Sequence, residues 1–495
     1  MRLLRVFIVQ VRYMLRNKKE KNFSEWYTEL VSEAGAHLAD MRYGIQGAIV
    51  ETPWAVRIIR AFEGMLEKEV ESDGHEPMLF PTIVPEAYMK KEKEHVKGFA
   101  PELYWVTEGG SKKLEERFYL RPTGESQIYP MYSLWIRSWN QLPFRRYQSR
   151  ISVFRFEPTT RPFLRGREFN FFESHDVFAT HEEALKQVKR DMEYSENVMH
   201  KKLGLPFIFV RRPQWDKFAG AVDTYGAETI VDGKVNTVAS THDLGQNFSK
   251  TYGVTFADKN EKQEYGWQTC YGPGLIRIMA ALISIHGDNN GLVLPFEIAP
   301  VQIAVIPILF DKKSAAVEKK CVMLEKELKE KGYRVKYDNS ENSAGWKYNQ
   351  WEMLGAPIRI EVGPREVKEK TLTLVRRDTR AKEKISEKSL EKKIEEYADD
   401  ILKNITKKAE AELKNSIYEA KNYADAKKLL ETRRGMVKVP FCSIEMDGQR
   451  CAEKLQSETT AKVRGTLYNK TEKAGGKCIV CGKPAKHIVY VAKSY

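Results

Sequence analysis

Residues 153–169 read VFRFEPTTRPFLRGREF, and this stretch decides how the chain is expected to fold. Side chains two residues apart on a strand face the same side of a sheet, so Arg155 and Glu157 are expected to project together. The prolines that follow favour a short loop, and a returning strand would bring Arg165 and Phe169 back beside them. Such a surface would carry two arginines, a carboxylate and an aromatic ring, and these groups suit the binding of a nucleoside triphosphate. An exposed basic hairpin is the alternative for this segment.

The bulk composition indicates a large folded chain with an anionic partner. Its 495 residues are enough for roughly three or four domains. A net charge of +14 and a pI of about 9.2 favour a polyanion, although a basic surface alone would give the same excess. No apolar run of about 18 residues is present, so no membrane span is predicted.

The first residues, MRLLRVFIVQVRYMLRNKKE, are basic and apolar. Arg5 and Arg12 interrupt the apolar stretches, which argues against a signal peptide. An organelle presequence would be expected to contain serine, which is absent here, and a start codon placed too far upstream is the other interpretation. We expect residues 1–21 to be a basic extension and the folded sequence to begin near Phe23.

A cluster of cysteines near the C-terminal end has the ligand count of a closed, structural zinc site. These residues are Cys442, Cys451, Cys478 and Cys481, of which the last two form a C-x2-C knuckle. The spacing of the first two is loose for a zinc finger, and two disulfides are the alternative. Cys270 and Cys321 are expected to be ordinary buried thiols.

Apolar spacing predicts a helix over residues 55–71, and strands alternate with helices from there to residue 298. Beyond that point a small α/β unit is expected. It has strands at 301–309, 333–338, 357–363 and 371–378, and helices at 312–331 and 344–354. Residues 386–430 are charged and helical in pattern, with an apolar stripe through Leu390, Ile394, Tyr397 and Ile401 that is typical of a packing helix.

A further segment with residues suited to nucleotide binding, CYGPGLIR (270–277), leads into an apolar helix. Gly272 and Gly274 let the backbone pack closely, and Arg277 can cover a nucleobase and reach a terminal phosphate. A plain helix entry gives the same pattern, which gains force here from its place downstream of residues 153–169.

Taken together, these segments resemble the motifs of the class II aminoacyl-tRNA synthetases. From about Phe23 to Tyr495 the chain is similar to the prolyl-tRNA synthetase family of archaea and the eukaryotic cytosol. The stretches that carry the resemblance are RPTGES (121–126), TRPFLRGREF (160–169), WDKFAGA (215–221), THDLGQNFSK (241–250), IHGDNNGLVLP (285–295), GWKYNQWEMLGAPIRIEVGPRE (345–366) and the terminal Lys-Ser-Tyr. The editing insertion of bacterial relatives has no counterpart.

The resemblance implies an α+β catalytic domain built on an antiparallel sheet over residues 22–298. An α/β anticodon-binding domain would follow over 299–400, and a small zinc-containing α+β domain over 401–495. Residues 74–81, GHEPMLFP, resemble motif 1, the dimer-interface element of these enzymes, so a homodimer formed through the region around Pro81 is implied. The resemblance also implies a cytoplasmic enzyme that activates L-proline with ATP and Mg²⁺. The resulting prolyl-adenylate would be transferred to the 3′ end of proline tRNA.

Proline carries a secondary ammonium with two N–H donors, so its pocket needs acceptors. Thr123 and Glu125, two residues apart, can provide a hydroxyl and a carboxylate, although Glu125 could instead cap a helix. The residues that the resemblance implies for binding the substrate proline are Thr123, Glu125, Arg155, Phe171, His175 and His242. The ATP residues implied are Arg155, Glu157, Arg165, Phe169, Thr237, Ser240 and Arg277. Arg155 and Arg277 would be catalytic through charge stabilisation, and no side-chain nucleophile is needed.

The family likeness also places tRNA recognition in the α/β unit. Its aromatic, cationic and acceptor groups suit the readout of unstacked anticodon bases. They are Trp346, Lys347, Trp351, Arg359, Glu361 and Arg365, of which the two tryptophans could equally be core residues.

Several positions depart from the family pattern. The stretch Phe171-Phe172-Glu173-Ser174-His175 replaces Trp-Gln-Glu-Gly-His, and Thr237 and Ser240 stand where a glutamine and a threonine are usual. These changes lie near the expected amino-acid pocket. They leave open a ligase for another small amino acid or acceptor, and a catalytically inactive paralogue.

Overall fold

The structure is a computed structural model that describes residues 15–90, 102–309 and 314–495. Most of the expected basic extension, residues 1–14, lies outside the described residues. The chain divides into two compact units. Among the described residues, the smaller contains 15–43, 50–58, 282–309 and 314–405, and the larger contains 44–49, 59–90, 102–281 and 406–495.

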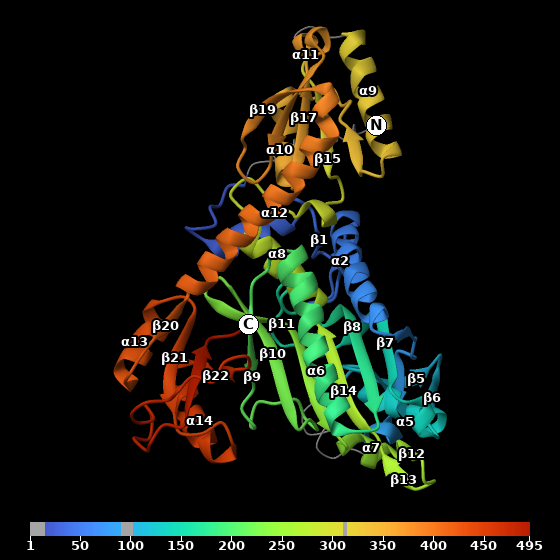
Figure 1. The fold of residues 1–495 in the computed structure, drawn as a ribbon, viewed down its shortest axis with the longest axis vertical. Coiled ribbons are helices and arrows are strands. Elements are labelled where there is room, and N and C mark those ends of the chain that lie inside the picture. Colours follow the sequence, from blue (N-terminus) through green and yellow to red (C-terminus); the bar gives the residue numbers. More distant parts are fainter. Residues whose placement is uncertain (1–14, 91–101, 310–313) are drawn as a thin grey trace, which may run out of the picture. The chain divides into compact units, whose positions relative to one another are not determined.

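The larger unit is built on one eleven-stranded sheet, which Figure 1 draws from the red C-terminal strands to the green and cyan ones. The strand order is β20-β21-β23-β22-β9-β10-β11-β14-β8-β7-β3. All neighbouring pairs are antiparallel except β20–β21 and β3–β7. The strands are β3 (Glu76–Pro77), β7 (Phe144–Phe154), β8 (Glu168–Phe178), β9 (Ile208–Arg211), β10 (Asp223–Val231), β11 (Lys234–Gly245), β14 (Trp267–Pro273), β20 (Ile417–Glu419), β21 (Met436–Phe441), β22 (Lys462–Leu467) and β23 (His487–Ala492).

Strands β7 and β8 form the hairpin that the sequence predicted, with Val153 opposite Phe169. The prediction that Arg155 and Glu157 lie on a strand is wrong, because β7 ends at Phe154. The Arg155 amide still donates to the Arg167 carbonyl at 2.9 Å, but the Phe156 amide donates to the Glu102 carbonyl instead. Pro158 and Pro162, which follow, cannot donate to a sheet ladder. Both arginine and glutamate therefore project from the loop that joins the two strands.

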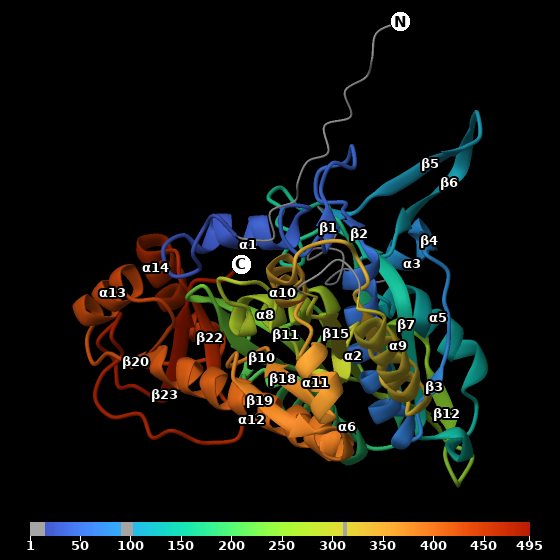
Figure 2. The same ribbon diagram turned by 90° about the horizontal axis from the view of Figure 1, so that it is seen from above.

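Helices cover this sheet, and smaller sheets flank it. Helix α6 packs against β11 and β14, and it begins with a capping box formed by Thr180 and Glu183. Figure 2 shows the β5–β6 hairpin extending away from the large sheet. The remaining elements of this unit are β4 (Ile83–Pro85), α3 (Glu86–Lys90), β5 (Trp105–Gly109), β6 (Lys112–Leu120), α5 (Glu125–Trp135), α6 (His181–Ser195), α7 (Asn247–Tyr252), β12 (Thr255–Ala257), β13 (Gln263–Tyr265), α13 (Tyr423–Thr432) and α14 (Gln449–Thr459).

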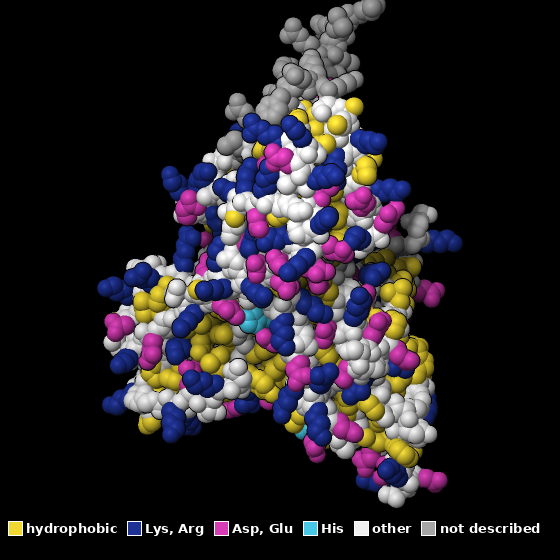
Figure 3. All heavy atoms as spheres, turned by 45° about the horizontal axis from the view of Figure 1, so that its top comes forward, with side chains coloured by type: hydrophobic (Ala, Val, Ile, Leu, Met, Phe, Trp, Pro, Cys, Tyr) yellow, Lys and Arg dark blue, Asp and Glu magenta, His cyan; other side chains and the backbone are white. Residues whose placement is uncertain are grey.

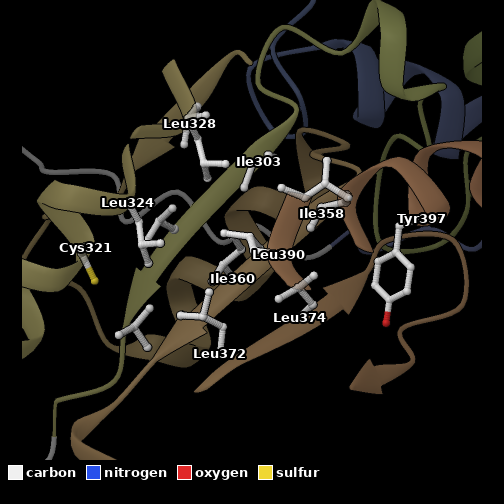
Figure 4. Packing of buried hydrophobic residues seen from close by; sticks show 14 of the residues in the cluster. Ile303, Cys321, Leu324, Leu328, Ile358, Ile360, Leu372, Leu374, Leu390 and Tyr397 are labelled. Carbon is white, nitrogen blue, oxygen red and sulfur yellow. The ribbon is translucent and has the colours of Figure 1, made fainter. Parts of the chain in front are cut away.

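The smaller unit contains a five-stranded mixed sheet of order β16-β15-β17-β18-β19. Figure 4 shows its core, where side chains of the strands meet those of α9 and α12. Its elements are α1 (Phe23–Val31), β1 (Ala39–Asp40), β2 (Val50–Glu51), β15 (Ile303–Pro307), α9 (Ala315–Glu330), β16 (Val335–Tyr337), α10 (Ala344–Met353), β17 (Ile358–Val362), α11 (Pro364–Glu369), β18 (Thr371–Arg376) and β19 (Lys382–Ser386). Helices α2 (Pro53–Ser72), α8 (Leu275–His286) and α12 (Leu390–Asn415) contain residues of both units.

The predicted strands and helices of this α/β unit are all present, and α11 and β19 add to them. The apolar stripe from Leu390 to Ile401 is buried in its core, as predicted. The single helical segment expected over 386–430 is wrong, however. Strand β20 separates α12 from α13, because Ile417 and Tyr418 pack into the apolar clusters beside β21. No described helix is long and apolar enough to cross a membrane.

Candidate active site

A cavity of about 210 Å³ lies in the larger unit, lined by residues of β8, β11 and β14, the loop after β7 and the starts of α5 and α8. Every residue predicted for proline or ATP lines it. These are Thr123, Glu125, Arg155, Glu157, Arg165, Phe169, Phe171, His175, Thr237, Ser240, His242 and Arg277. Residues more than 150 positions apart in sequence thus meet in one place, since Thr123 and Arg277 line the same cavity.

One end of the cavity presents a buried carboxylate. Glu125 is the first residue of α5 and is 1% exposed. Its Oε2 accepts a hydrogen bond from Thr123 Oγ1 at 2.6 Å, and its Oε1 accepts one from Cys270 Sγ at 3.5 Å. Among the described residues no helix N–H donates to it, so the helix-capping alternative does not apply here. The carboxylate faces the cavity instead.

A second buried carboxylate supports the first from behind. Glu173 Oε2 accepts hydrogen bonds from the Gly124 amide at 3.1 Å and from His175 Nε2 at 3.0 Å. The other ring nitrogen of His175 lies 3.0 Å from the Tyr129 hydroxyl. Burial alone would lower the pKa of His175, but Glu173 raises it overall, and the histidine in turn lowers the pKa of Glu173. The sequence assigned no role to Glu173, although it lies two residues before His175.

His242 has the opposite electrostatic setting. Burial and the nearby Arg212 lower its pKa to about 3, so the ring is neutral at ordinary pH. Its Nδ1 lies 2.9 Å from Thr224 Oγ1, its Nε2 lies 3.0 Å from Ser240 Oγ, and Phe218 packs on the ring. A neutral ring suits a wall next to an ammonium ion better than an imidazolium does.

The other end of the cavity is strongly cationic. Burial lowers the pKa of Arg277 to about 10, with Arg155 and Arg165 adding to the effect. Glu157 is the acceptor in this group, with its Oε2 3.5 Å from Arg165 Nε. Phe169 adds an aromatic face that packs edge-on against Phe171. Converging arginines that repel one another are stabilised by a bound polyanion.

The predicted anticodon residues occupy two kinds of position. Trp351 is 7% exposed and donates through Nε1 to Asp338, and the nearly buried Lys347 donates to the Asp338 carbonyl. Arg359 is ion-paired with Glu361 at 3.0 Å. Trp346 is half-buried, whereas Arg365 is exposed. The structure therefore places Trp351 in the core, which was the alternative kept open for it.

The four clustered cysteines meet in space. Their sulfur atoms all lie within 4.8 Å of one another, and all four are free thiols. Cys442 Sγ and Cys451 Sγ are 3.7 Å apart. A disulfide would need about 2.05 Å. A tetrahedral zinc ion with Zn–S bonds of about 2.3 Å would hold its sulfurs about 3.8 Å apart. The arrangement therefore fits a four-thiolate zinc site.

Figure 3 shows lysine and arginine side chains interspersed with acidic ones over the face that it draws. At the cationic end of the cavity, by contrast, three arginines converge, Arg155, Arg165 and Arg277.

Family comparisons agree with this geometry. Residues 104–286 match the tRNA synthetase class II core domain (G, H, P, S and T), and residues 302–397 match an anticodon binding domain. Residues 423–495 match the C-terminal domain of prolyl-tRNA synthetase. Fold and site together define a class II aminoacyl-tRNA synthetase.

Individual relatives narrow the class. The chain is 50% identical to a proline–tRNA ligase of Thermofilum pendens, over 96% of this chain and 98% of that one. A proline–tRNA ligase of Pyrococcus abyssi is 40% identical over 97% and 99%. The structure of Giardia lamblia prolyl-tRNA synthetase in complex with prolyl-adenylate superposes with a TM-score of 0.91, at 32% identity over 98% of this chain and 100% of that one. The chain belongs to the proline–tRNA ligase family, which confirms the predicted family, ligase class and α+β fold.

Proposed function

We propose that the cavity activates L-proline with ATP, forms prolyl-adenylate and transfers the prolyl group to tRNA. The observation that carries this proposal is the pairing of two ends in one cavity. A buried, hydrogen-bonded carboxylate lies at one end and three arginines at the other. An amino acid with a charged amine and a nucleoside triphosphate are bound together by such a site.

At the carboxylate end, Glu125 accepts from the secondary ammonium of proline and Thr123 holds Glu125 in place. Phe171 and the neutral His242 flank the pyrrolidine ring. The proline carboxylate then points toward Arg155. A charged acceptor of this kind discriminates against ligands whose amine is missing or misplaced, because the carboxylate would be left buried and unpaired.

At the cationic end, Arg155 bridges the proline carboxylate and the α-phosphate of ATP, while Phe169 and Arg277 enclose the adenine. The proline carboxylate oxygen attacks the α-phosphorus in line, the bond to the bridging oxygen breaks, and pyrophosphate leaves. The protein accelerates this step by holding the two reactants in line and by stabilising the charge of the transition state. A terminal ribose hydroxyl of tRNA then attacks the adenylate carbonyl and releases AMP.

Metal ions fit two places in this scheme. Bound Mg²⁺ would neutralise charge on the pyrophosphate, and Glu157 is the carboxylate that lines the cationic end. One carboxylate plus substrate phosphates is a usual environment for that ion. Zinc would be held by Cys442, Cys451, Cys478 and Cys481, whose four thiolates leave no open coordination position and so imply a structural role.

The remaining parts of the proposal concern the whole protein. Residues 22–298 form the catalytic domain, 299–400 the anticodon-binding domain and 401–495 the zinc-binding domain. We also propose that the protein is cytoplasmic and that it forms a homodimer through the region around Pro81. The match of residues 302–397 to an anticodon binding domain supports recognition of tRNA by the second domain.

The test is ATP–pyrophosphate exchange by the full-length protein, measured with each of the twenty amino acids. We expect robust exchange with L-proline and weak exchange with alanine and cysteine, the similarly small competitors. Robust exchange with another amino acid, and none with proline, would show that the changes around Phe171 and Ser240 have moved the specificity. No exchange with any amino acid, in protein that binds ATP, would indicate an inactive paralogue.

A further inference from the structure

A buried ionic network contacts Thr237, and its members are not among the residues that line the cavity. Glu228 on β10 is fully buried and is contacted by two arginines, Arg212 and Arg464. Arg464 Nη2 donates to Glu228 Oε1 at 2.9 Å and to Oε2 at 3.1 Å. Arg212 also pairs with Asp216 at 3.1 Å. Arg464 belongs to the cysteine-containing C-terminal part of the chain, and the other members belong to the class II core.

The network ends on a side chain that lines the cavity. Thr237 Oγ1 accepts from Arg464 Nη2 at 3.2 Å and from Arg212 Nη2 at 3.1 Å, and it donates to Glu228 Oε1 at 3.2 Å. The carbonyl of the same threonine lies 3.5 Å from Arg277 Nη1. Thr237 thus has its hydroxyl fixed by the network while its backbone faces a predicted ATP-binding arginine.

The local backbone explains how Arg464 reaches this position. Strand β22 pairs with β9, which Figure 1 shows between the red C-terminal strands and the green core strands. On the other side of β22, its register with β23 shifts between Val463 and Gly465, and Gly465 has a φ of +131°. A Cβ at Gly465 would lie 1.9 Å from the Arg211 carbonyl oxygen. Only glycine permits this approach, which brings Arg464 within reach of Glu228.

We propose that Arg464 is a positioning residue for the ATP end of the cavity, acting through Thr237, so that the C-terminal part of the chain helps to build the nucleotide site. The proposal rests on the proposed function and adds a residue that the class II motifs do not contain. Arg464 is 6% exposed and fixes both the Glu228 carboxylate and the Thr237 hydroxyl. In this way it determines the shape of the cavity wall that Thr237 and Arg277 share.

A simple structural ion pair is the competing explanation. Such a pair contributes to stability mainly by avoiding an unpaired buried charge. Arg464 also donates through Nη2 to the hydroxyl of Thr237, a residue that lines the cavity. A pair that served only to neutralise Glu228 would not need this contact, which therefore favours a positioning role.

The test compares full-length variants in two assays, ATP–pyrophosphate exchange and calorimetric binding of a non-hydrolysable ATP analogue. Arg464→Lys keeps a positive charge beside Glu228, but its shorter side chain does not place an ammonium where Arg464 Nη2 contacts both Glu228 and Thr237. We expect it to weaken analogue binding and raise the KM for ATP by about 5-fold, from the loss of one hydrogen bond of about 1 kcal/mol. The KM for proline should stay within about 2-fold of the parent on the same scale. Arg464→Ala should be worse in the same direction.

Two further variants separate the explanations. Thr237→Val should weaken ATP binding, and the double variant Arg464→Lys/Thr237→Val should be no worse than the worse single variant, because the two residues act as one unit. Arg450→Ala, an exposed arginine on α14 in the same part of the chain, is the matched control and should match the parent.

Each outcome decides the matter. ATP binding by Arg464→Lys at the parent level, with Arg464→Ala merely unfolded or less stable, would overturn the proposal in favour of a structural ion pair. Fully additive effects in the double variant would do the same. Absence of proline-dependent exchange in the parent would instead remove the proposed function, while the binding assay would still report on Arg464.

Discussion

The amide of Gly124 donates a hydrogen bond of 3.1 Å to the carboxylate of Glu173, so the residue just before Glu125 is held by a strand far along the chain. A Cβ at Gly124 would lie 2.5 Å from Glu173 Oε1, which leaves room only for glycine. Glu125 is therefore aimed into the cavity by a turn that β8 fixes from behind. Glu125 faces the cavity, whereas Glu173 holds the turn that precedes it. Substituting Glu125 is therefore expected to affect the bound ligand directly.

Glu125→Ala should impair the use of proline selectively. Losing a charged acceptor of a buried ammonium costs about 1.5–3 kcal/mol, which corresponds to a rise in the KM for proline of about 10- to 100-fold. ATP analogue binding should change little, and Glu182→Ala, an exposed glutamate on α6, is the control. Equal losses for both substrates would mean that Glu125 only maintains the structure.

Arg155→Ala should reduce exchange by about 100-fold or more, the scale for removing one donor to a transition state. The loss should fall mainly on kcat, because the arginine stabilises charge that develops during attack on the α-phosphorus. Steady-state exchange kinetics give the measurement, with the surface variant Arg190→Ala as the matched control. A change confined to the KM for proline would contradict this role.

The cysteine cluster should hold one zinc ion per chain, measurable by metal analysis of the reduced protein. Cys478→Ser should lower the zinc content and the melting temperature, whereas Cys321→Ser, a buried thiol outside the cluster, should leave the zinc content unchanged. Well under one zinc in carefully prepared parent protein, or an intact mass that shows two disulfides, would refute the assignment.

Asp191 should make stability depend on pH. It is fully buried on α6, accepts from Thr241 at 2.6 Å and lies near Asp176 and His75. Burial, and next the Asp176 charge, raise its pKa to about 7, against an ordinary value of 3.8. The folded state then binds the extra proton between pH 4 and 7, so this contribution to stability is present below about pH 4 and is lost as pH rises to about 7.

Asp191→Asn should remove that dependence. Its melting temperature should fall less than that of the parent between pH 5 and pH 8. The difference is limited to about 1.4 kcal/mol per pH unit for a single proton. Parallel melting curves for parent and variant over this range would show that Asp191 is ionised in the folded protein throughout.

The two kinds of predicted anticodon residue should respond differently. Arg365→Ala, at an exposed position, should lower tRNA charging by about 10-fold, the effect of one lost charged contact, and leave proline activation unchanged. Trp351→Ala should instead lower the melting temperature, because Trp351 is part of the core. Replacing the anticodon guanines of the tRNA should reproduce the Arg365→Ala effect. Charging that is insensitive to that replacement would remove anticodon recognition from this unit.

The sequence predicted local features better than distant ones. Thr123, Glu125, Arg155, Phe169 and Arg277 were predicted from short-range patterns, and all five line the cavity. Glu228 and Arg464 carry no such pattern, because they are 236 residues apart and meet only through strand pairing. Helical periodicity in residues 386–430 was likewise overridden at Ile417, where pairing with β21 wins over local propensity. Contacts that depend on the order of strands in a sheet cannot be predicted from sequence motifs or from hydrophobic periodicity.

The pairing of β22 with β9 also bears on how the protein is made. Strand β9 is complete once Arg211 has been synthesised, but its partner contains Thr466 and Leu467. While the ribosome adds the intervening residues, β9 remains an open edge with unpaired backbone groups, the kind of edge that recruits other chains. Nascent or prematurely ended chains should therefore be the form of this protein that aggregates, because only the finished C-terminal strands cover the edge of β9.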